Sequence, residues 1–134
     1  MTDTAAASPV RAAPQVVRAT AEGGDEALSS RVGFRIDPDE PVFAGHYPDF
    51  PIFPGVCVVE CVHRAALATA PGAPLSLAAL ETARFVGAVF PGDVLTVDGT
   101  WTATDGGWTY AATATTERGT AAKVRLRYAT EGTR

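Results

Sequence analysis

Residues 45–60 read GHYPDFPIFPGVCVVE, and no other stretch says as much about the fold and chemistry of this chain. His46 lies in a segment that three prolines stiffen, and Glu60 follows fourteen residues later inside an apolar run. An ionisable side chain among valines costs free energy unless a partner or a function compensates for it. A histidine and such a carboxyl group can together move two protons in one reaction. His46 and Glu60 are therefore candidate acid–base residues, and the alternative is a capped loop histidine with a glutamate in a structural ion pair.

Two motifs in this chain carry a family resemblance. The first is Gly-His-aromatic-Pro, a later Pro-Gly pair, and a glutamate five residues beyond that glycine. The second, at residues 81–93, contains ETARF and then FPGD. In this order the motifs resemble those of the 3-hydroxyacyl-(acyl-carrier-protein) dehydratases, which are hotdog-fold enzymes of fatty-acid and polyketide synthesis. The resemblance spans about residues 31–129, and two co-linear motifs make chance a poor explanation.

Three departures from that family are visible. The chain shows no counterpart of the family's opening segment, a short helix with an Arg-Tyr-Pro-Phe-like signature. Arg64 stands where a glutamine usually follows the catalytic glutamate by four residues, and Tyr47 stands where phenylalanine is usual. The chain therefore looks like a divergent member from a specialised pathway rather than from primary lipid synthesis.

The resemblance implies how a 3-hydroxyacyl thioester would lose water. His46 is the expected base for the proton at C2, because an unperturbed imidazole is available in its neutral form near neutral pH. Glu60 is the expected partner at the C3 hydroxyl, either as the acid or by ordering a water. The family uses the backbone amide at the position of Gly55 for the thioester oxygen. It takes the two acid–base roles from opposite protomers of a dimer.

Arg64 is the departure that could disturb this chemistry. It lies one helical turn beyond Glu60, where it could pair with the carboxyl group. A neighbouring cation favours the ionised form of a carboxyl group, which would make Glu60 a poorer acid. Three outcomes stay open: Arg64 turns elsewhere, Glu60 only orders water, or the chain is catalytically weak. Tyr47, Arg64 and Phe85 are accordingly assigned to the substrate tunnel or to modulation of the site.

Composition and net charge limit the classes of protein to which this chain can belong. The chain has 134 residues, of which 46% are hydrophobic and 19% charged, so we expect residues 10–134 to form one packed domain after a disordered leader at residues 1–9. The net charge of -4 argues against a nucleic-acid partner. No apolar run approaches the roughly 20 residues that span a bilayer, and no secretion signal is recognisable. We therefore expect a cytoplasmic protein with no membrane partner.

Cys57, Cys61 and His63 raise the question of a metal site. They lack the usual zinc-ligand spacing and a fourth partner, so small buried thiols and a core or interface histidine are the better interpretation. We expect no metal. The resemblance also implies no resident cofactor, because the substrate arrives on the phosphopantetheine arm of an acyl carrier protein.

The hydrophobic pattern predicts an α+β protein, and the resemblance makes it a hotdog fold, with a long central helix wrapped by an antiparallel sheet of about six strands. Residues 56–70 begin with β-branched residues typical of a strand, and the resemblance rather than the pattern makes them the helix. Strands are predicted at residues 15–22, 28–36, 75–89, 94–104, 108–116 and 120–129. In the last strand Val124, Leu126 and Tyr128 face one way, which suits a sheet with one face on a core.

The opposite face of the last predicted strand is basic. Lys123, Arg125 and Arg127 lie on it, and together with Arg84 they could receive an acyl carrier protein, which is typically acidic. A solvated outer face is the more ordinary interpretation. By the resemblance we also expect a homodimer or a heterodimer with a paralogue, or a higher oligomer.

The leading hypothesis is dehydration of a carrier-bound 3-hydroxyacyl thioester to the 2-enoyl thioester, in fatty-acid or polyketide-type biosynthesis. Two alternatives stay open. Hotdog thioesterases generally use a carboxylate and water without this loop histidine, so His46 argues against thioester hydrolysis. The non-enzymatic alternative is a catalytically silent subunit that shapes the tunnel of a heterodimeric dehydratase, and Arg64 keeps it open.

Overall fold

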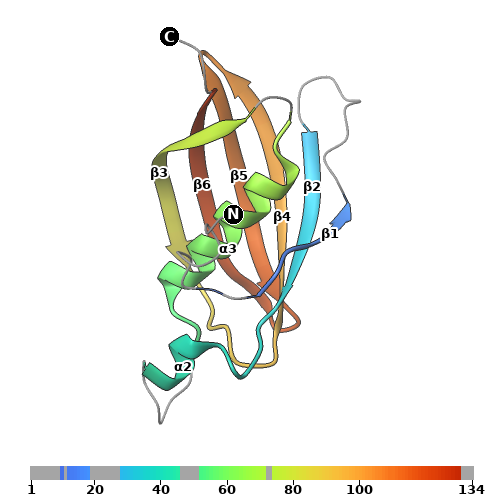
Figure 1. Cartoon of the computed structure of the whole chain (residues 1–134), viewed down its shortest axis with the longest axis vertical. Helices are drawn as coiled ribbons and strands as arrows, with labels where there is room; N and C mark the ends of the chain where they lie inside the picture. The colour runs from blue at the N-terminus through green and yellow to red at the C-terminus, as the bar shows by residue number, and fades with distance from the viewer. Residues whose placement is uncertain (1–9, 11, 19–27, 46–51, 72–73, 131–134) are drawn as a thin grey trace.

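The computed structural model describes residues 10, 12–18, 28–45, 52–71 and 74–130, and the predicted leader at residues 1–9 lies outside them. Strands and helices follow one another along this part of the chain in an α+β arrangement, as predicted (Figure 1). They are β1 (Gln15–Arg18), β2 (Leu28–Arg35), α2 (Pro41–Gly45), α3 (Gly55–Thr69), β3 (Leu75–Phe85), β4 (Val94–Thr104), β5 (Gly107–Thr116) and β6 (Gly119–Thr130).

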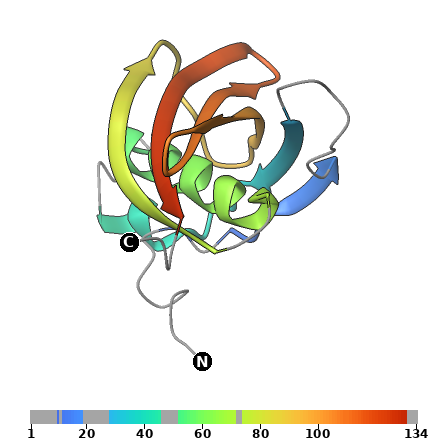
Figure 2. The same cartoon turned by 90° about the horizontal axis from the view of Figure 1, so that it is seen from above.

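The strands form one antiparallel sheet in the order β1-β2-β4-β5-β6-β3. The sheet curves around α3, which lies across its concave face (Figure 2). This is the predicted arrangement of a long helix wrapped by a six-stranded sheet. It makes β3 an edge strand that runs beside the helix, and this edge matters for the site.

Alternating burial explains why the pattern located β2 correctly. Val32, Phe34 and Ile36 are fully buried, whereas Arg31 and Arg35 are exposed. Successive side chains of a strand point to opposite faces of the sheet, so one face enters the core and the other meets water. The inward side chains of β6 are likewise at most 3% exposed, as predicted.

An aromatic cluster fills the space between the sheet and the last turn of α3. The Trp101 ring centroid lies 4.7 Å from that of Tyr110 and 5.5 Å from that of Tyr128. Trp101 Nε1 donates to Thr69 Oγ1 at 3.3 Å, and Thr69 Oγ1 donates to the Ala65 carbonyl at 2.8 Å. Aromatic pairs at such separations add about 0.5–1.5 kcal/mol beyond burial. The cluster therefore fixes the far end of the helix on β4.

β3 ends at Phe85, four residues before the predicted end at residue 89. The N–H groups of Val86 and Gly87 both donate to the Ala121 carbonyl, at 2.8 and 3.1 Å. Two donors on one acceptor break the one-to-one pairing of the ladder, so the chain leaves the sheet here. The predicted extension of this strand is therefore wrong.

The helices also differ from expectation. α2 was not predicted; Pro41 opens it, at the helix position where proline is favoured because its missing N–H would have no intrahelical partner. α3 has the predicted position, but Val56 and Leu67 on it are 70% and 47% exposed. The sheet therefore covers only one side of this helix in the single chain.

The FPGD block forms a closed turn before β4. The Asp93 carboxylate accepts hydrogen bonds from the Phe90 N–H at 2.8 Å and from the Arg118 guanidinium. Gly92 has a φ of 91°, which favours glycine, and its N–H donates to the Ile36 carbonyl at 2.6 Å. The block therefore joins the end of β2 to the start of β4, and its conspicuous residues have a structural explanation.

Candidate active site

The predicted base His46 and its neighbour Tyr47 lie outside the residues that the structure describes. The structure does describe the chain on both sides of them. Phe43 in α2 and Phe53 just before α3 are buried, with ring centroids 6.0 Å apart. The Phe53 N–H also donates to the Val89 carbonyl at 2.7 Å. The two ends of the segment that carries His46 are thus held together near the start of α3.

Gly55 opens α3, and an aromatic ring covers it. A Cβ placed on Gly55 would lie 3.0 Å from two carbons of the Phe85 ring. The Pro54 carbonyl accepts the N–H groups of Cys57 and Val58, at 2.9 and 3.1 Å. The N–H groups that precede these two have no intrahelical partner, and they point out of the positive end of the helix dipole. This end of α3 is therefore suited to an oxygen that gains negative charge.

Glu60 lies half-buried in the middle of α3. The charge of Glu60 contributes to the pKa shifts of several core side chains. Burial, assisted by the fields of Glu40 and Glu60, raises the pKa of Cys57 to about 11. Burial also raises the pKa of the Tyr128 phenol, and the charge of Glu60 contributes to that shift. The Glu60 carboxyl group therefore lies within electrostatic reach of the core beneath the helix.

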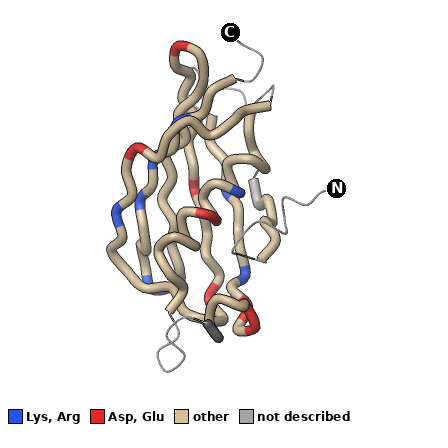
Figure 3. Tube along the Cα trace, turned by 60° about the vertical axis from the view of Figure 1, so that its left-hand side comes forward, with Lys and Arg blue, Asp and Glu red and all other residues tan. Residues whose placement is uncertain are grey.

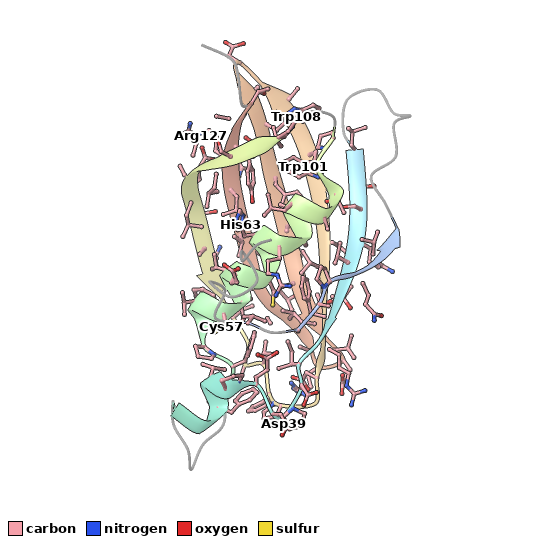
Figure 4. All side chains as sticks on the ribbon, viewed as in Figure 1. Asp39, Cys57, His63, Trp101, Trp108 and Arg127 are labelled. Carbon is pink, nitrogen blue, oxygen red and sulfur yellow. The ribbon has the colours of Figure 1, made fainter. Side chains whose placement is uncertain are left out.

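His63, one turn beyond Glu60, interacts with β6 (Figure 4). Its Nδ1 lies 2.7 Å from the Tyr128 hydroxyl, and the two rings are stacked with an interplanar angle of 9°. Burial lowers the pKa of His63, and the Glu60 charge opposes that shift. The imidazole is therefore kept neutral near neutral pH. His63 is thus a core or interface histidine, as expected, but the sequence did not indicate that Tyr128 would be its partner.

Arg64 reaches the N-terminal segment. Its Nη1 donates to the Val10 carbonyl at 2.9 Å, and the Val10 side chain is only 1% exposed. Of the three outcomes foreseen for this residue, the contact favours the one in which the guanidinium is directed to another partner.

The helix-facing side of β3 is apolar and exposed. Leu77 and Leu80 lie opposite Tyr128 and Leu126 of β6, so they share a sheet face with the core. They are nevertheless 45% and 51% exposed, and Phe85 at the end of the strand is 50% exposed. Exposed apolar side chains that share one face of an edge strand favour binding of an apolar ligand or of another chain. We call Leu77, Leu80 and Phe85 the β3 apolar face.

The opposite face of the same edge is basic, and basic positions gather along the strands at the left of Figure 3. Arg84 lies directly opposite Lys123, and Arg125 is two residues further along β6. Arg127 is held by Glu81 at 3.0 Å. The ion pairs found within the described ranges include neither Arg84, Lys123 nor Arg125. A cavity of about 240 Å³ is lined in part by Lys123 and Arg125.

Glu40 was missed by sequence reasoning. It is a carboxyl residue only 3% exposed, directly before α2, and its field raises the pKa of Cys57 on α3. An acidic residue directly before a proline that opens a helix was the available signal. Glu40 and Asp39, the latter labelled in Figure 4, also line a cavity of about 380 Å³, and none of the predicted site residues lines it.

The two cysteines are buried free thiols, as interpreted from the sequence. Burial raises the pKa of both Cys57 and Cys61. Within the described ranges no group of three or more His, Cys, Asp or Glu residues is placed to hold a metal ion. In the same part of the chain, no helix has the length and apolar character that crossing a membrane requires.

Known proteins resemble this chain in part of its sequence and in its fold. The 3-hydroxyacyl-[acyl-carrier-protein] dehydratase FabZ of Thermus thermophilus is 43% identical over an alignment of 68 positions, which covers 46% of this chain and 48% of that protein. The chain thus spans about half the length of such relatives. An uncharacterised protein of Erwinia carotovora superposes with a TM-score of 0.69 at 23% identity, over 88% of this chain and 97% of that one. A chain of the ApeI:P dehydratase heterocomplex of Xenorhabdus doucetiae superposes with a TM-score of 0.65 at 22% identity, over 87% and 97%.

These structural likenesses support the hotdog fold, which the resemblance in the two motifs had implied. A sequence profile described as ApeI dehydratase matches residues 22–125, and this range includes both motifs, the whole of α3 and the edge strand β3. Because that match covers most of the chain, the protein belongs to the ApeI-like dehydratase family.

Proposed function

We propose that the protein dehydrates a 3-hydroxyacyl thioester carried on an acyl carrier protein to the 2-enoyl thioester. Membership of the ApeI-like dehydratase family supports the reaction type. The observation that carries the proposal is the position of Glu60 between two contacts of α3 with the β3–β6 edge. One is Phe85 against Gly55, and the other is His63 against Tyr128, opposite Leu77. In this proposal the Glu60 carboxyl group serves an acyl chain that binds along the β3 apolar face.

The proposed reaction breaks a C–H bond at C2 and a C–O bond at C3, forms a C=C bond and releases water. His46 takes the C2 proton, and Glu60 delivers a proton to the departing hydroxyl or orders a water there. Each positioned acid or base contributes roughly 10²–10⁴ in rate. The Gly55 N–H binds the thioester oxygen as it gains charge, and one such donor is worth about 3 kcal/mol. The reaction needs no resident cofactor.

In this proposal the working unit is a dimer in which His46 of one protomer faces Glu60 of the other. The β3 apolar face supports it, because exposed apolar side chains on an edge strand favour pairing with another chain. The partner is a second copy or a paralogue of the same fold. The basic residues Arg84, Lys123 and Arg125 on the outer face are proposed to receive the acidic carrier protein.

The test offers the purified chain a 3-hydroxyacyl carrier-protein thioester and follows the products by mass spectrometry. We expect loss of water, and we expect His46→Ala and Glu60→Gln each to lower the rate by about 10²-fold or more without changing the melting temperature or the oligomeric state. Free acid as the product would favour the thioesterase alternative. No reaction by the chain alone, with reaction after addition of a paralogue, would favour the silent subunit.

A further inference from the structure

The cavity of about 240 Å³ on the outer face of β6 has no part in the proposed chemistry. Its lining includes Thr82, Ala111, Thr113, Lys123 and Arg125, and we call it the β6 groove. The register of the sheet brings these residues together. Arg125 lies between Thr82 of β3 and Ala111 of β5, and Lys123 lies opposite Thr113 of β5. Two cations and two hydroxyl groups therefore surround one hollow in the sheet.

The two cations of the β6 groove have no carboxylate partner among the residues that the structure describes. On the same strand, Arg127 pairs with Glu81 at 3.0 Å. Arg84 lies directly opposite Lys123, and like charges at opposite positions destabilise a sheet. This cluster of positive charge lies in a chain whose net charge is -4. A bound anion would relieve the repulsion between these cations.

The donors of the β6 groove favour a phosphate group over a carboxylate. A carboxylate is planar, and the fork of one guanidinium can pair with both of its oxygens. A phosphate group presents three acceptor oxygens and a larger charge. The groove offers a guanidinium, an ammonium group and two hydroxyl groups, from strands on both sides of β6. Its volume is below the roughly 300–1,000 Å³ of pockets for drug-sized ligands, so it suits one group rather than a whole molecule.

We infer that the β6 groove binds the phosphate group of the arm that joins the proposed acyl substrate to its carrier protein. The position of the groove supports this. Arg84, opposite Lys123, directly precedes Phe85, and the Phe85 ring covers Gly55. The groove and the proposed thioester site therefore adjoin the same end of β3. This inference rests on the proposed function, because the arm belongs to that substrate, and it names the part of the substrate that these cations bind.

The first test measures binding to the full chain and needs no catalysis. Pantetheine 4′-phosphate should shift the backbone amide resonances of Thr113 and Arg125 in NMR titrations, and pantetheine, which lacks the phosphate, should not. Thr113→Val keeps the shape of the side chain and removes the hydroxyl, so it should weaken binding about threefold. Arg125→Gln removes a charged donor and should weaken binding about tenfold.

Arg127→Gln and Thr109→Val are the matched controls. Arg127 lies on the same face of β6 as Arg125, and Thr109 lies opposite Arg127 on β5, but neither lines the groove. Arg125→Gln and Arg127→Gln lower the net charge equally. An equal loss of binding in the two would show diffuse electrostatic attraction and would overturn the inference. So would equal binding of pantetheine with and without its phosphate.

Inorganic phosphate is the third probe, because it separates a free anion from the arm. It should compete with pantetheine 4′-phosphate for the β6 groove and bind more weakly, since it lacks the rest of the arm. If inorganic phosphate shifts the Thr113 and Arg125 resonances and pantetheine 4′-phosphate does not displace it, the groove is a site for a free anion. That result would overturn the assignment to the arm.

The second test compares KM for 3-hydroxyacyl thioesters of pantetheine, of phosphopantetheine and of the carrier protein. Arg125→Gln should raise KM about tenfold for the two that carry the phosphate, and the KM of the pantetheine thioester should not depend on this residue. A rise for the carrier-protein thioester alone would mean that Arg125 meets acidic side chains of the carrier, and it would overturn the inference. Absence of dehydration in the wild type, with phosphate-dependent binding as expected, would instead count against the proposed function alone.

Discussion

The ring of Phe85, at the end of β3, covers Gly55, the first residue of α3. Two of its ring carbons lie 3.0 Å from the position that a Cβ on Gly55 would take. This contact brings together the two sequence motifs, because Gly55 belongs to the first and Phe85 to the second. In the proposed reaction it sets how closely a thioester can approach the backbone N–H of residue 55.

Gly55→Ala should push the Phe85 ring away from the start of α3. We expect the free energy of unfolding to fall by about 1 kcal/mol, the low end for overpacking, because the half-exposed ring can move. We expect the dehydration rate to fall about tenfold, because the added methyl group lies beside the proposed N–H donor. The double variant Gly55→Ala/Phe85→Leu should regain stability, since leucine is smaller. Chemical denaturation and initial rates measure the two effects. Equal stability of the single and double variants would show that the ring is not the obstacle.

Gly99→Ala should destabilise the protein strongly. A Cβ there would overlap the buried ring of Tyr110, which has no free volume to enter. A cost of about 1–3 kcal/mol or more is expected from such overpacking. Gly33→Ala on β2 is the matched control, because the nearest atom to its Cβ would be 4.0 Å away. Urea midpoints should fall for the first variant and stay equal or rise for the second.

Asp93 should make the fold sensitive to acid. Burial alone would raise the pKa of Asp93, but the hydrogen bonds from Arg118 and the Phe90 N–H outweigh it and lower the pKa. The unfolded chain then takes up this proton at a higher pH than the folded chain. The stabilisation is therefore complete above the ordinary carboxyl pKa and is lost as pH falls through the lower folded value.

Asp93→Asn should accordingly reduce the free energy of unfolding at neutral pH by about 1–3 kcal/mol and flatten its decline in acid. Asp98→Asn is the control, since its ion pair with Arg31 is more exposed and such pairs contribute at most about 1 kcal/mol. Denaturation curves between pH 3 and 7 compare them. A profile of Asp93→Asn that matches the wild type would refute this account of the FPGD block.

Leu80→Lys should weaken the proposed dimer. It places a charge in the middle of the β3 apolar face, where pairing would bury it without a partner. We expect the dissociation constant to rise by about tenfold or more, as measured by light scattering after size exclusion. Val94→Lys is the control, because Val94 is also 50% exposed but begins β4. If the dissociation constant of Leu80→Lys equals that of the wild type, the dimer interface lies elsewhere.

Charge reversal on the outer face of β6 should raise KM only for the substrate that is bound to a carrier protein. Lys123→Glu/Arg125→Glu should raise KM for the carrier-protein thioester about tenfold, because complementary charges steer such encounters. The same variant should leave KM for a pantetheine thioester unchanged. Arg31→Glu is the control, because the Arg31 side chain is exposed and β2 is separated from β6 and β3 in the sheet. A rise in both KM values would mean that the substitutions disturb the site rather than the docking of the carrier.

Sequence reasoning reached the fold because two kinds of local signal agreed. Alternation along β2 and β6 identified the inward residues, and the motif around Gly55 identified the helix against its own β-branched start. Both signals depend on which face a residue occupies or on a short spacing. The end of β3 was misplaced because it depends on two hydrogen bonds, from the Val86 and Gly87 N–H groups, to the Ala121 carbonyl of another strand. Such a contact between strands leaves no signal in the local periodicity of the sequence.

The candidate site residues could be identified from the sequence alone, because a histidine and a glutamate at a distinctive spacing are visible without coordinates. Their roles stay predictions, and His46 lies outside the described residues. Only the tertiary structure decided what the side chains meet: Arg64 at the Val10 carbonyl, His63 at Tyr128 and Phe85 at Gly55. These partners are 54, 65 and 30 residues apart in sequence. Such contacts depend on how the sheet curves around the helix, and a pattern along the chain does not encode that curvature at single residues.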